Sequence, residues 1–267
     1  MKAMILCGGQ GTRLREETEF KPKPLVEIGD IPILVHIMNT YAAYGVTDFI
    51  LCLGYKGWMI KDYFLNYNLR TNDFTLRMDY DRTITMHADP MPMPWSITFA
   101  DTGLTAMTGA RIKRAAKYLG DDTQFMVTYG DGLCDVDLHA LQAFHNAEES
   151  IGTVTGVRAP GRFGELNISE NSVVSFTEKP KHTLGYINGG YFIFEREFLD
   201  RIDDDDQCIL EQRPLESLAE NGLLSVYRHD GFWMCMDTYR EKVILEEMWL
   251  RGNAPWTQRA SLAGAMK

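Results

Sequence analysis

In the first half of the chain, short apolar runs alternate with segments of helical periodicity. Continuous apolar runs at 3–7, 49–53 and 125–129 are typical of strands buried on both faces of a parallel sheet. Between them, apolar residues spaced i, i+3, i+4 and i+7 predict a helix over 34–41, and a second helix is expected over 109–118. Strands that alternate with helices predict an α/β fold, a Rossmann-like and mostly parallel sheet flanked by helices.

This rhythm breaks between about Asn72 and Phe99. Short alternating runs and three prolines between positions 90 and 94 predict a hairpin or another excursion from the main sheet. The stretch 90–95 is either part of a subunit interface or a plain exposed loop, and the sequence leaves both open.

After Gly152 the pattern changes to a series of strands. The predicted strands are 154–157, 166–168, 173–177 and 191–194. We interpret them as a smaller lobe grafted onto the sheet. Thr238, followed three residues later by Glu241, forms a capping box that predicts a final helix over 238–250. The residues after Trp256 are expected to form a frayed tail.

Composition narrows the classes of function. The 267 residues are 45% hydrophobic and 24% charged, as in ordinary globular proteins. The net charge of −10 argues against nucleic acid or an anionic membrane as a partner, because phosphate-rich surfaces repel such a chain. No run approaches the roughly 18 apolar residues of a membrane span. Five scattered cysteines form neither a disulfide framework nor a zinc motif, so we expect a soluble, cytoplasmic protein.

A glycine-rich loop follows the first strand directly. It reads Gly8-Gly9-Gln10-Gly11-Thr12-Arg13-Leu14. Glycines let backbone N–H groups approach phosphates. The loop matches neither the dinucleotide fingerprint, which needs glycine or alanine where Leu14 stands, nor the P-loop, which needs glycine and lysine at 13 and 14. Arg13, Lys21 and Lys23 beside it indicate an anion site, although a plain strand-to-helix turn is the alternative.

Two aspartates follow predicted strands. Asp131 comes after the run 125–129, and Asp237 comes just before the capped helix. Ligands of open α/β sheets gather at the carboxyl ends of strands, where two carboxylates could hold Mg²⁺ together with substrate phosphates. Each aspartate alone could equally cap a turn.

A third signal is the pair Glu178-Lys179, followed by Asn188. A carboxylate can accept hydrogen bonds from two sugar hydroxyls while the neighbouring lysine meets a phosphate. Taken alone the signal is weak, because such pairs are common on solvated surfaces.

Together these segments resemble the sugar nucleotidyltransferases, the pyrophosphorylases that make nucleotide-diphosphate sugars. The resemblance rests on Gly8–Leu14, Lys23-Pro24, Gly130-Asp131, Glu178-Lys179-Pro180, Asn188-Gly189-Gly190 and Asp237. Within the family, the chain looks most like the members that use CTP. That closer likeness rests on Lys21-Pro22-Lys23-Pro24, Met107–Arg114, Tyr129–Gly132, Gly161–Gly164, Gly231-Phe232-Trp233 and Met236-Asp237-Thr238.

The resemblance implies that the cytidylyl group of CTP is transferred to α-D-glucose 1-phosphate, giving CDP-glucose and pyrophosphate. Such enzymes require Mg²⁺, assemble as homo-oligomers, hexamers in the nearest case, and supply deoxysugars for surface polysaccharide such as lipopolysaccharide O-antigen. Alternatives are the same fold using UTP or dTTP, a cytidylyltransferase with another phosphorylated acceptor, and a non-catalytic nucleotide-sensing subunit. A nicotinamide-dependent dehydrogenase is a weaker alternative, because the glycine loop does not match the dinucleotide fingerprint.

The resemblance also assigns roles to residues of this sequence. The nucleotide would be bound by Leu6, Gly8, Gly9, Gln10, Gly11, Thr12, Arg13, Lys23, Thr108, Gly109, Arg111 and Gly130. The sugar phosphate would be bound by Gly164, Glu178, Lys179 and Asn188. The catalytic cations would be Arg13, Lys23 and Lys179, and the metal ligands would be Asp131 and Asp237.

One physical argument favours cytosine. Cytosine presents only acceptors at N3 and O2, whereas uracil and thymine present an N3–H donor. Because a guanidinium only donates, Arg111 near that edge would favour cytosine. Arg111 could instead contact a phosphate or lie on a helix surface.

We therefore expect a single nucleotidyltransferase domain over residues 1–256. Its nucleotide-binding part would span about 1–135 and its sugar-binding part about 136–237. The C-terminal helix would follow over 238–250, and the tail would cover 257–267.

Overall fold

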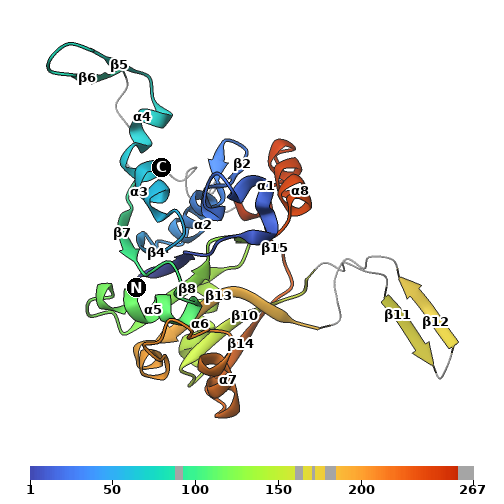
Figure 1. Ribbon diagram of the computed structural model, residues 1–267. Coiled ribbons are helices and arrows are strands. Elements are labelled where there is room, and N and C mark those ends of the chain that lie inside the picture. The colour runs from blue at the N-terminus through green and yellow to red at the C-terminus, as the bar shows by residue number, and fades with distance from the viewer. Residues whose placement is uncertain (88–92, 160–164, 170–171, 178–184, 258–267) are drawn as a thin grey trace.

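The computed structural model describes residues 1–87, 93–159, 165–169, 172–177 and 185–257 (Figure 1). Its centre is a seven-stranded sheet in the order β14-β10-β13-β8-β1-β4-β7. The strands are β1 (Ala3–Cys7), β4 (Asp48–Leu53), β7 (Ser96–Asp101), β8 (Gln124–Tyr129), β10 (Gly152–Val157), β13 (Ile187–Glu195) and β14 (Leu224–His229). All neighbouring pairs are parallel except those of β13, which runs antiparallel to both β8 and β10. The expected α/β fold, with its mostly parallel sheet, is confirmed.

Helices cover both faces of this sheet. The longer helices are α2 (Ile33–Ala42), α3 (Gly57–Leu65), α5 (Thr108–Ala115), α6 (Leu138–Ala147), α7 (Arg213–Glu220) and α8 (Tyr239–Leu250). Short helices are α1 (Arg15–Thr18) and α4 (Tyr67–Thr71). In β1, Ile5 belongs to the core under α2, while Met4 and Leu6 belong to the core under α5 and α7. Successive side chains of a strand point to opposite faces, so a strand buried on both sides must be apolar throughout.

The helix predictions at 34–41, 109–118 and 238–250 are confirmed. Helix α5 continues as a 3₁₀ turn over Ala116–Tyr118. Helix α8 begins with the expected capping box, in which Thr238 and Glu241 exchange side-chain and backbone hydrogen bonds. Among the described residues, no helix is long and apolar enough to cross a membrane.

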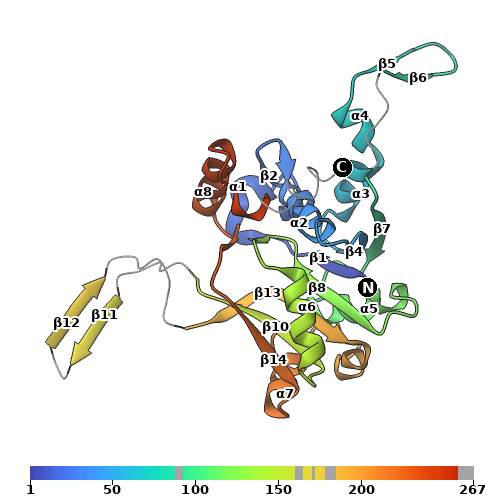
Figure 2. The same cartoon turned by 180° about the vertical axis from the view of Figure 1, so that it is seen from behind.

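Two hairpins stand away from the sheet (Figures 1 and 2). The first, β5 (Phe74–Leu76) with β6 (Ile84–Met86), confirms the expected excursion. The second pairs β11 (Glu165–Ser169) with β12 (Ser172–Thr177). The four strands predicted after Gly152 are thus divided, because β10 and β13 extend the central sheet and only β11 and β12 lie apart.

The stretch expected to be an interface or an exposed loop, 90–95, lies partly outside the described residues. Trp95 is half-buried and packs edge-on against Phe49, with ring centroids 5.7 Å apart. Trp95 is thus not a fully exposed loop residue within the chain, and the interface stays a prediction.

Two small ribbons complete the fold. Strands β2 (Glu27–Ile28) and β3 (Ile31–Pro32) pair just before α2. Strands β9 (Gly132–Cys134) and β15 (Trp233–Cys235) pair antiparallel and bring residues about 100 positions apart in sequence side by side. The β9–β15 ribbon begins at the carboxyl end of β8, so it links the central sheet to α8.

The side chain of His36 links α2 to two neighbouring segments by hydrogen bonds. Its side chain is buried, its Nε2 donates to the carbonyl of Ile28 at 2.9 Å, and its Nδ1 accepts from the indole of Trp256 at 3.2 Å. These two bonds require a neutral ring. Burial lowers the pKa of His36 below its ordinary value, and the Ile28 carbonyl and Glu246 oppose this shift without cancelling it.

We therefore expect the stability of the protein to fall as the pH drops below about 6.5, where the unfolded chain takes up a proton that folded His36 resists. In His36→Gln this contribution disappears, and the free energy of unfolding in urea should vary less between about pH 7.5 and about pH 5.5. An unchanged pH dependence in the variant would show that His36 is not responsible.

Candidate active site

The glycine-rich loop turns sharply at the end of β1. Gly11 has φ of 63°, a left-handed conformation that favours glycine, and the 3₁₀ turn Thr12–Leu14 follows it. At Gly8 the constraint is space, because an added Cβ would lie 2.0 Å from Nη1 of Arg111. Glycine is therefore favoured at Gly11 by the left-handed backbone conformation and at Gly8 by the close approach of the Arg111 side chain.

A cavity of about 350 Å³ opens beside this loop, at the carboxyl ends of β1 and β8. Its walls come from five segments: the end of β1 with the glycine loop, Lys23-Pro24, the start of α5 with the residues just before it, the end of β8 with Asp131, and Asp237 before α8. The lining residues named by sequence analysis are Leu6, Gly8, Gly9, Gly11, Thr12, Arg13, Lys23, Thr108, Arg111, Gly130, Asp131 and Asp237. The structure thus brings together twelve of the predicted residues from five separate parts of the sequence.

Four charged side chains meet at one end of the cavity. The Nζ atom of Lys23 lies between two carboxylates, 2.6 Å from Oδ2 of Asp131 and 2.7 Å from Oδ1 of Asp237. Arg13 Nη1 binds the other oxygen of Asp237 at 2.7 Å. The side chain of Lys23 is only 11% exposed and that of Arg13 is 73% exposed, so the lysine is fixed while the arginine faces solvent.

The pKa shifts follow from this arrangement. Burial by itself would lower the pKa of Lys23, but attraction and hydrogen bonds from Asp131 and Asp237 outweigh it and raise the pKa. Burial would raise the pKa of Asp237, yet Lys23 and Arg13 hold it below its ordinary value. At neutral pH the cluster therefore consists of an ammonium and ionised carboxylate, a charged site within reach of a phosphorylated ligand.

The β9–β15 ribbon and the cap of α8 fix the two carboxylates. Asp131 precedes β9, and its carbonyl accepts a hydrogen bond from the backbone N–H of Met236 at 2.8 Å. Glu241 accepts from the backbone N–H of Asp237 and of Thr238, both at 2.8 Å. The capping box thus starts the helix and also anchors one of the aspartates.

Arg111 is buried, and its guanidinium is largely committed to protein oxygens. Nη1 donates to the carbonyl of Leu53 at 3.0 Å and to Oγ1 of Thr102 and the carbonyl of Gly103, both at 2.8 Å. Nη2 donates to the carbonyl of Gly8 at 3.1 Å. A contact from these nitrogens to a cytosine edge would have to replace one of these bonds. The structure therefore corrects our reason for cytosine selectivity, since Arg111 mainly ties the glycine loop to the neighbouring strand ends.

This geometry makes Arg111→Lys a strongly destabilising change. Lysine has three donors on one nitrogen and cannot reach the same set of acceptors. The carbonyl of Gly103 then loses its donor, at about 1–3 kcal/mol, while the carbonyls of Leu53 and Gly8 lose a charged donor but keep the backbone N–H groups of Thr102 and Tyr55. We expect a loss of roughly 2–4 kcal/mol in the free energy of unfolding, measured in urea. Arg251→Lys is the control, because Arg251 is exposed and pairs only with Glu247 on α8. Equal stability of the two variants would contradict the role given to Arg111.

Several residues at the cavity escaped the sequence analysis. Tyr129 lines it, and its hydroxyl donates to Glu211, whose other carboxylate oxygen accepts from Thr108 Oγ1 at 2.7 Å. Met107 and Ala106 form part of the wall. Tyr129 ends an apolar strand next to Asp131, a signal that could have identified it, whereas nothing in the sequence around Glu211 indicates its position.

Three of the remaining predicted residues lie outside the walls of the cavity. Gln10 lines a neighbouring cleft with Arg15 and Tyr55 rather than the cavity. Gly109 packs against Cys208, where an added Cβ would lie 2.7 Å from the sulfur, so it serves the packing of α5. Asn188 is exposed and donates to the hydroxyl of Tyr129 at 3.2 Å.

The other three predicted sugar-site residues cannot be placed. Gly164, Glu178 and Lys179 lie outside the described residues. Their roles stay predictions.

Comparison with known proteins agrees with the fold and the cavity. The family model described as "Nucleotidyl transferase" matches residues 2–234. The glucose-1-phosphate cytidylyltransferase of Salmonella typhi is 50% identical over 256 residues, which cover 96% of this chain and 98% of that protein. The mannose-1-phosphate guanyltransferase of Neurospora crassa is 32% identical over 240 residues, covering 88% of this chain and 60% of that protein.

Among solved structures, HddC from Yersinia pseudotuberculosis complexed with GMP-PN has a TM-score of 0.66 and 25% sequence identity. The match covers 93% of this chain and 99% of that one. The family resemblance inferred from the motifs is confirmed. The chain belongs to the nucleotidyl transferase family, and within it to the group of the glucose-1-phosphate cytidylyltransferases.

Proposed function

We propose that this protein transfers the cytidylyl group of CTP to α-D-glucose 1-phosphate, releasing pyrophosphate and CDP-glucose. The observation that carries the proposal is the cavity in which the glycine loop faces the cluster of Arg13, Lys23, Asp131 and Asp237. The cytidylyltransferase of Salmonella typhi, at 50% identity over nearly the whole chain, supports this choice of nucleotide and acceptor.

The reaction needs positioning and charge neutralisation more than covalent help from the protein. An oxygen of the sugar phosphate attacks the α-phosphorus of CTP in line, and pyrophosphate leaves with the electron pair of the broken P–O bond. The attacking phosphate is already an anion, so it needs no general base. Exposed Arg13 would meet the leaving pyrophosphate, and Lys23 would neutralise the phosphates of CTP.

The residues of the cavity fit a divalent cation. Asp131 and Asp237 already share one cation, the ammonium of Lys23, and carboxylate oxygens are the donors that Mg²⁺ prefers. We infer that these two aspartates hold Mg²⁺ when CTP is bound. The ion supplies charge neutralisation at the transferring phosphate. Lys23 would then be free to contact the phosphates, because its two partners take a new cation.

For the acceptor, the exposed position of Asn188 beside Tyr129 supports a sugar site on this side of the cavity. Glu178, Lys179 and Gly164 remain the proposed partners of the hexose and its phosphate. Gln10 and Gly109 remain proposed nucleotide contacts, although the cavity walls do not include them.

We further infer a homo-oligomer, as the resemblance predicts. The β5–β6 hairpin exposes Leu76, Met78, Tyr80 and Ile84, and so many exposed apolar side chains on one short hairpin are more typical of an interface than of a monomer's exterior. A cytoplasmic setting and a role in lipopolysaccharide biosynthesis belong to the same proposal.

Pyrophosphate release tests the function. The protein is incubated with Mg²⁺, glucose 1-phosphate and, in turn, CTP, UTP, dTTP, ATP or GTP. Release with CTP alone would support both the reaction and the choice of base. Equal release with UTP or dTTP would keep the reaction class and discard the choice of base. If no nucleotide gives pyrophosphate release, the assay is repeated with CTP and a series of other sugar phosphates. No pyrophosphate release with any of these acceptors would overturn the proposal.

A further inference from the structure

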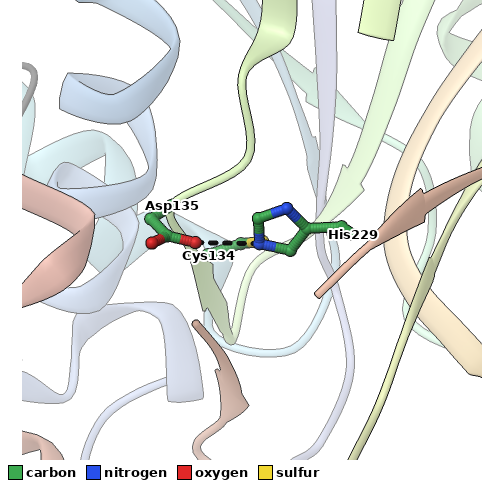
Figure 3. A group of neighbouring side chains, drawn as sticks. All are labelled: Cys134, Asp135 and His229. Atoms are coloured by element: carbon green, nitrogen blue, oxygen red, sulfur yellow. Dashed lines mark hydrogen bonds and ion pairs between the residues drawn. The ribbon is translucent and has the colours of Figure 1, made fainter. Parts of the chain in front are cut away.

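Three potential metal ligands meet at the far end of the β9–β15 ribbon. Cys134 is the last residue of β9, Asp135 follows it, and His229 ends β14. One ligand atom from each lies within 4.8 Å of the other two, and Asp135 Oδ1 is 2.8 Å from Nε2 of His229. Figure 3 shows the carboxylate and the imidazole pointing toward one another, with the side chain of Cys134 beside them.

This cluster is separate from the cavity that we assign to the nucleotide. Asp131 precedes β9 and Asp237 follows β15, so the cavity's carboxylates lie at one end of the antiparallel ribbon and Cys134 lies at the other. None of the three residues of the cluster lines the cavity.

The surroundings of the sulfur suit a thiolate only if a cation is close. The backbone N–H groups of Asp135 and Val136 donate to Cys134, which favours the charged form. Burial acts more strongly and raises the pKa of this thiol, and the charge of Asp135 acts in the same direction. A divalent cation among the three side chains would balance one thiolate and one carboxylate, leaving the buried group neutral.

The loop before β15 is shaped around the same side chains. A Cβ on Gly231 would lie 2.5 Å from Oδ1 of Asp135 and 2.7 Å from Cε1 of His229. Only glycine allows the chain to pass this closely while the carboxylate and the ring keep their positions. The structure therefore holds the aspartate and histidine together by its backbone as well as by their hydrogen bond.

We propose that Cys134, Asp135 and His229 bind one Zn²⁺ ion. Sulfur, imidazole and carboxylate are the ligands typical of zinc, whereas magnesium prefers oxygen alone. Bonds of about 2.3 Å to sulfur and about 2.0–2.2 Å to nitrogen and oxygen require donors roughly 3.5 Å apart. The observed separations, from 2.8 Å to at most 4.8 Å, bracket that value. A water on the side of half-exposed Asp135 would complete four-fold coordination.

Such an ion would have a structural task. It would tie the end of edge strand β14 to the ribbon whose opposite end carries Asp131 and Asp237. The proposal uses none of the residues assigned to nucleotide chemistry, so it stands or fails independently of the proposed function.

Cobalt provides a direct test because its spectrum reports sulfur ligation. The purified protein is stripped with a chelator, returned to buffer with excess Mg²⁺, and titrated with Co²⁺. We expect one equivalent to produce a near-ultraviolet thiolate-to-cobalt charge-transfer band and the strong visible bands of four-coordinate cobalt, both displaced by Zn²⁺. Binding through the carboxylate oxygens of Asp131 and Asp237 would give no charge-transfer band. Because Sγ of Cys235 lies 3.7 Å from Oδ2 of Asp237, a band from that site is recognised by its persistence in Cys134→Ser.

Variants assign the band to the cluster. Cys134→Ser is expected to abolish the charge-transfer band, and His229→Ala to weaken Zn²⁺ binding by more than the roughly 10–100-fold that loss of an outer partner costs. Cys208→Ser, which removes a half-buried cysteine elsewhere, should keep the band. Circular dichroism confirms that each variant is folded. Absence of the band in the unaltered protein, or its persistence in Cys134→Ser, would overturn the proposal.

Bound Zn²⁺ should also raise the midpoint of thermal unfolding. A ligand that binds only the folded state stabilises it in proportion to the logarithm of its concentration above the dissociation constant. We expect the rise in the unaltered protein and in Cys208→Ser, and its loss in Cys134→Ser. An equal rise in Cys134→Ser would mean that zinc binds elsewhere.

Discussion

Replacing Lys23 by methionine is expected to lower kcat/KM for CTP by about 10²–10³-fold, the usual cost of removing one preorganised charged or polar group from a transition state. Methionine keeps the length and apolar stem of the side chain and removes the charge. Lys23 is far less exposed than Arg13 and is the cation that lies between both carboxylates, so Arg13 cannot take its place. The measurement is steady-state pyrophosphate release with Mg²⁺, CTP and glucose 1-phosphate.

The same variant makes a second prediction that does not depend on turnover. Without the ammonium, Asp131 and Asp237 face each other with only Arg13 to offset their charge, so the pKa of Asp237 should rise and the free protein should lose stability. Added Mg²⁺ then has no lysine to displace. We expect it to raise the midpoint of thermal unfolding more in Lys23→Met than in the unaltered protein.

A matched control shows whether the effect depends on losing a positive charge at the cavity or on losing any partly buried positive charge. Lys242 is also partly buried and ion-paired, 3.5 Å from Glu17, but it does not line the cavity. Lys242→Met should retain turnover within a few-fold and should show no added response to Mg²⁺. Full turnover in Lys23→Met would remove Lys23 from the mechanism.

The elements of the fold could be predicted where a local pattern sufficed. Strand β1 has no polar residue over Ala3–Cys7 because its alternate side chains enter two different cores. Helix α8 follows from Thr238 and Glu241, whose side chains cap the backbone locally. The order of the strands was beyond such patterns. Nothing in the residues of β13 indicates that it runs antiparallel between β10 and β8, because pairing partners are chosen by the tertiary fold.

The residues of the candidate site could likewise be predicted where a local pattern marked them and not where the tertiary fold brings them together. Asp131 and Asp237 could be predicted because each follows a strand pattern. Asp131 does lie at the carboxyl edge of the parallel sheet, after β8, whereas Asp237 is brought beside it by the antiparallel β9–β15 ribbon, which the sequence did not indicate. Arg111 was placed at the site from its motif, but its bonds could not be predicted, since its main partners are backbone carbonyls, which every residue has and no motif marks. The cluster of Cys134 with His229 was equally hidden, because the two residues are distant in sequence and meet through the pairing of β9 with β15 and the short connection from β14 to β15.

Asp237→Asn is expected to be at least as damaging as Lys23→Met, with a loss of about 10²–10³-fold or more in kcat/KM. Asp237 binds both cations, one through each carboxylate oxygen, whereas Asp131 binds Lys23 alone among the residues that the structure describes. An amide has the same shape but no charge and only one acceptor oxygen. Asp131→Asn should therefore lose activity mainly through weaker Mg²⁺ binding, and Asp237→Asn should in addition release Arg13 and Lys23.

The Mg²⁺ dependence of turnover distinguishes these two losses. We expect the Mg²⁺ concentration that gives half-maximal activity to rise in both variants. Excess Mg²⁺ should restore the activity of Asp131→Asn more fully than that of Asp237→Asn. Chelation with EDTA should abolish turnover in the unaltered protein. Asp122→Asn is the control, because this carboxylate is also paired with a lysine, Lys2 at 3.1 Å, but at the opposite end of the sheet. Combining Asp131→Asn with Asp237→Asn should lower turnover little more than Asp237→Asn alone, because residues that hold one ion act as a unit. Strictly additive losses would mean that the two aspartates serve separate steps.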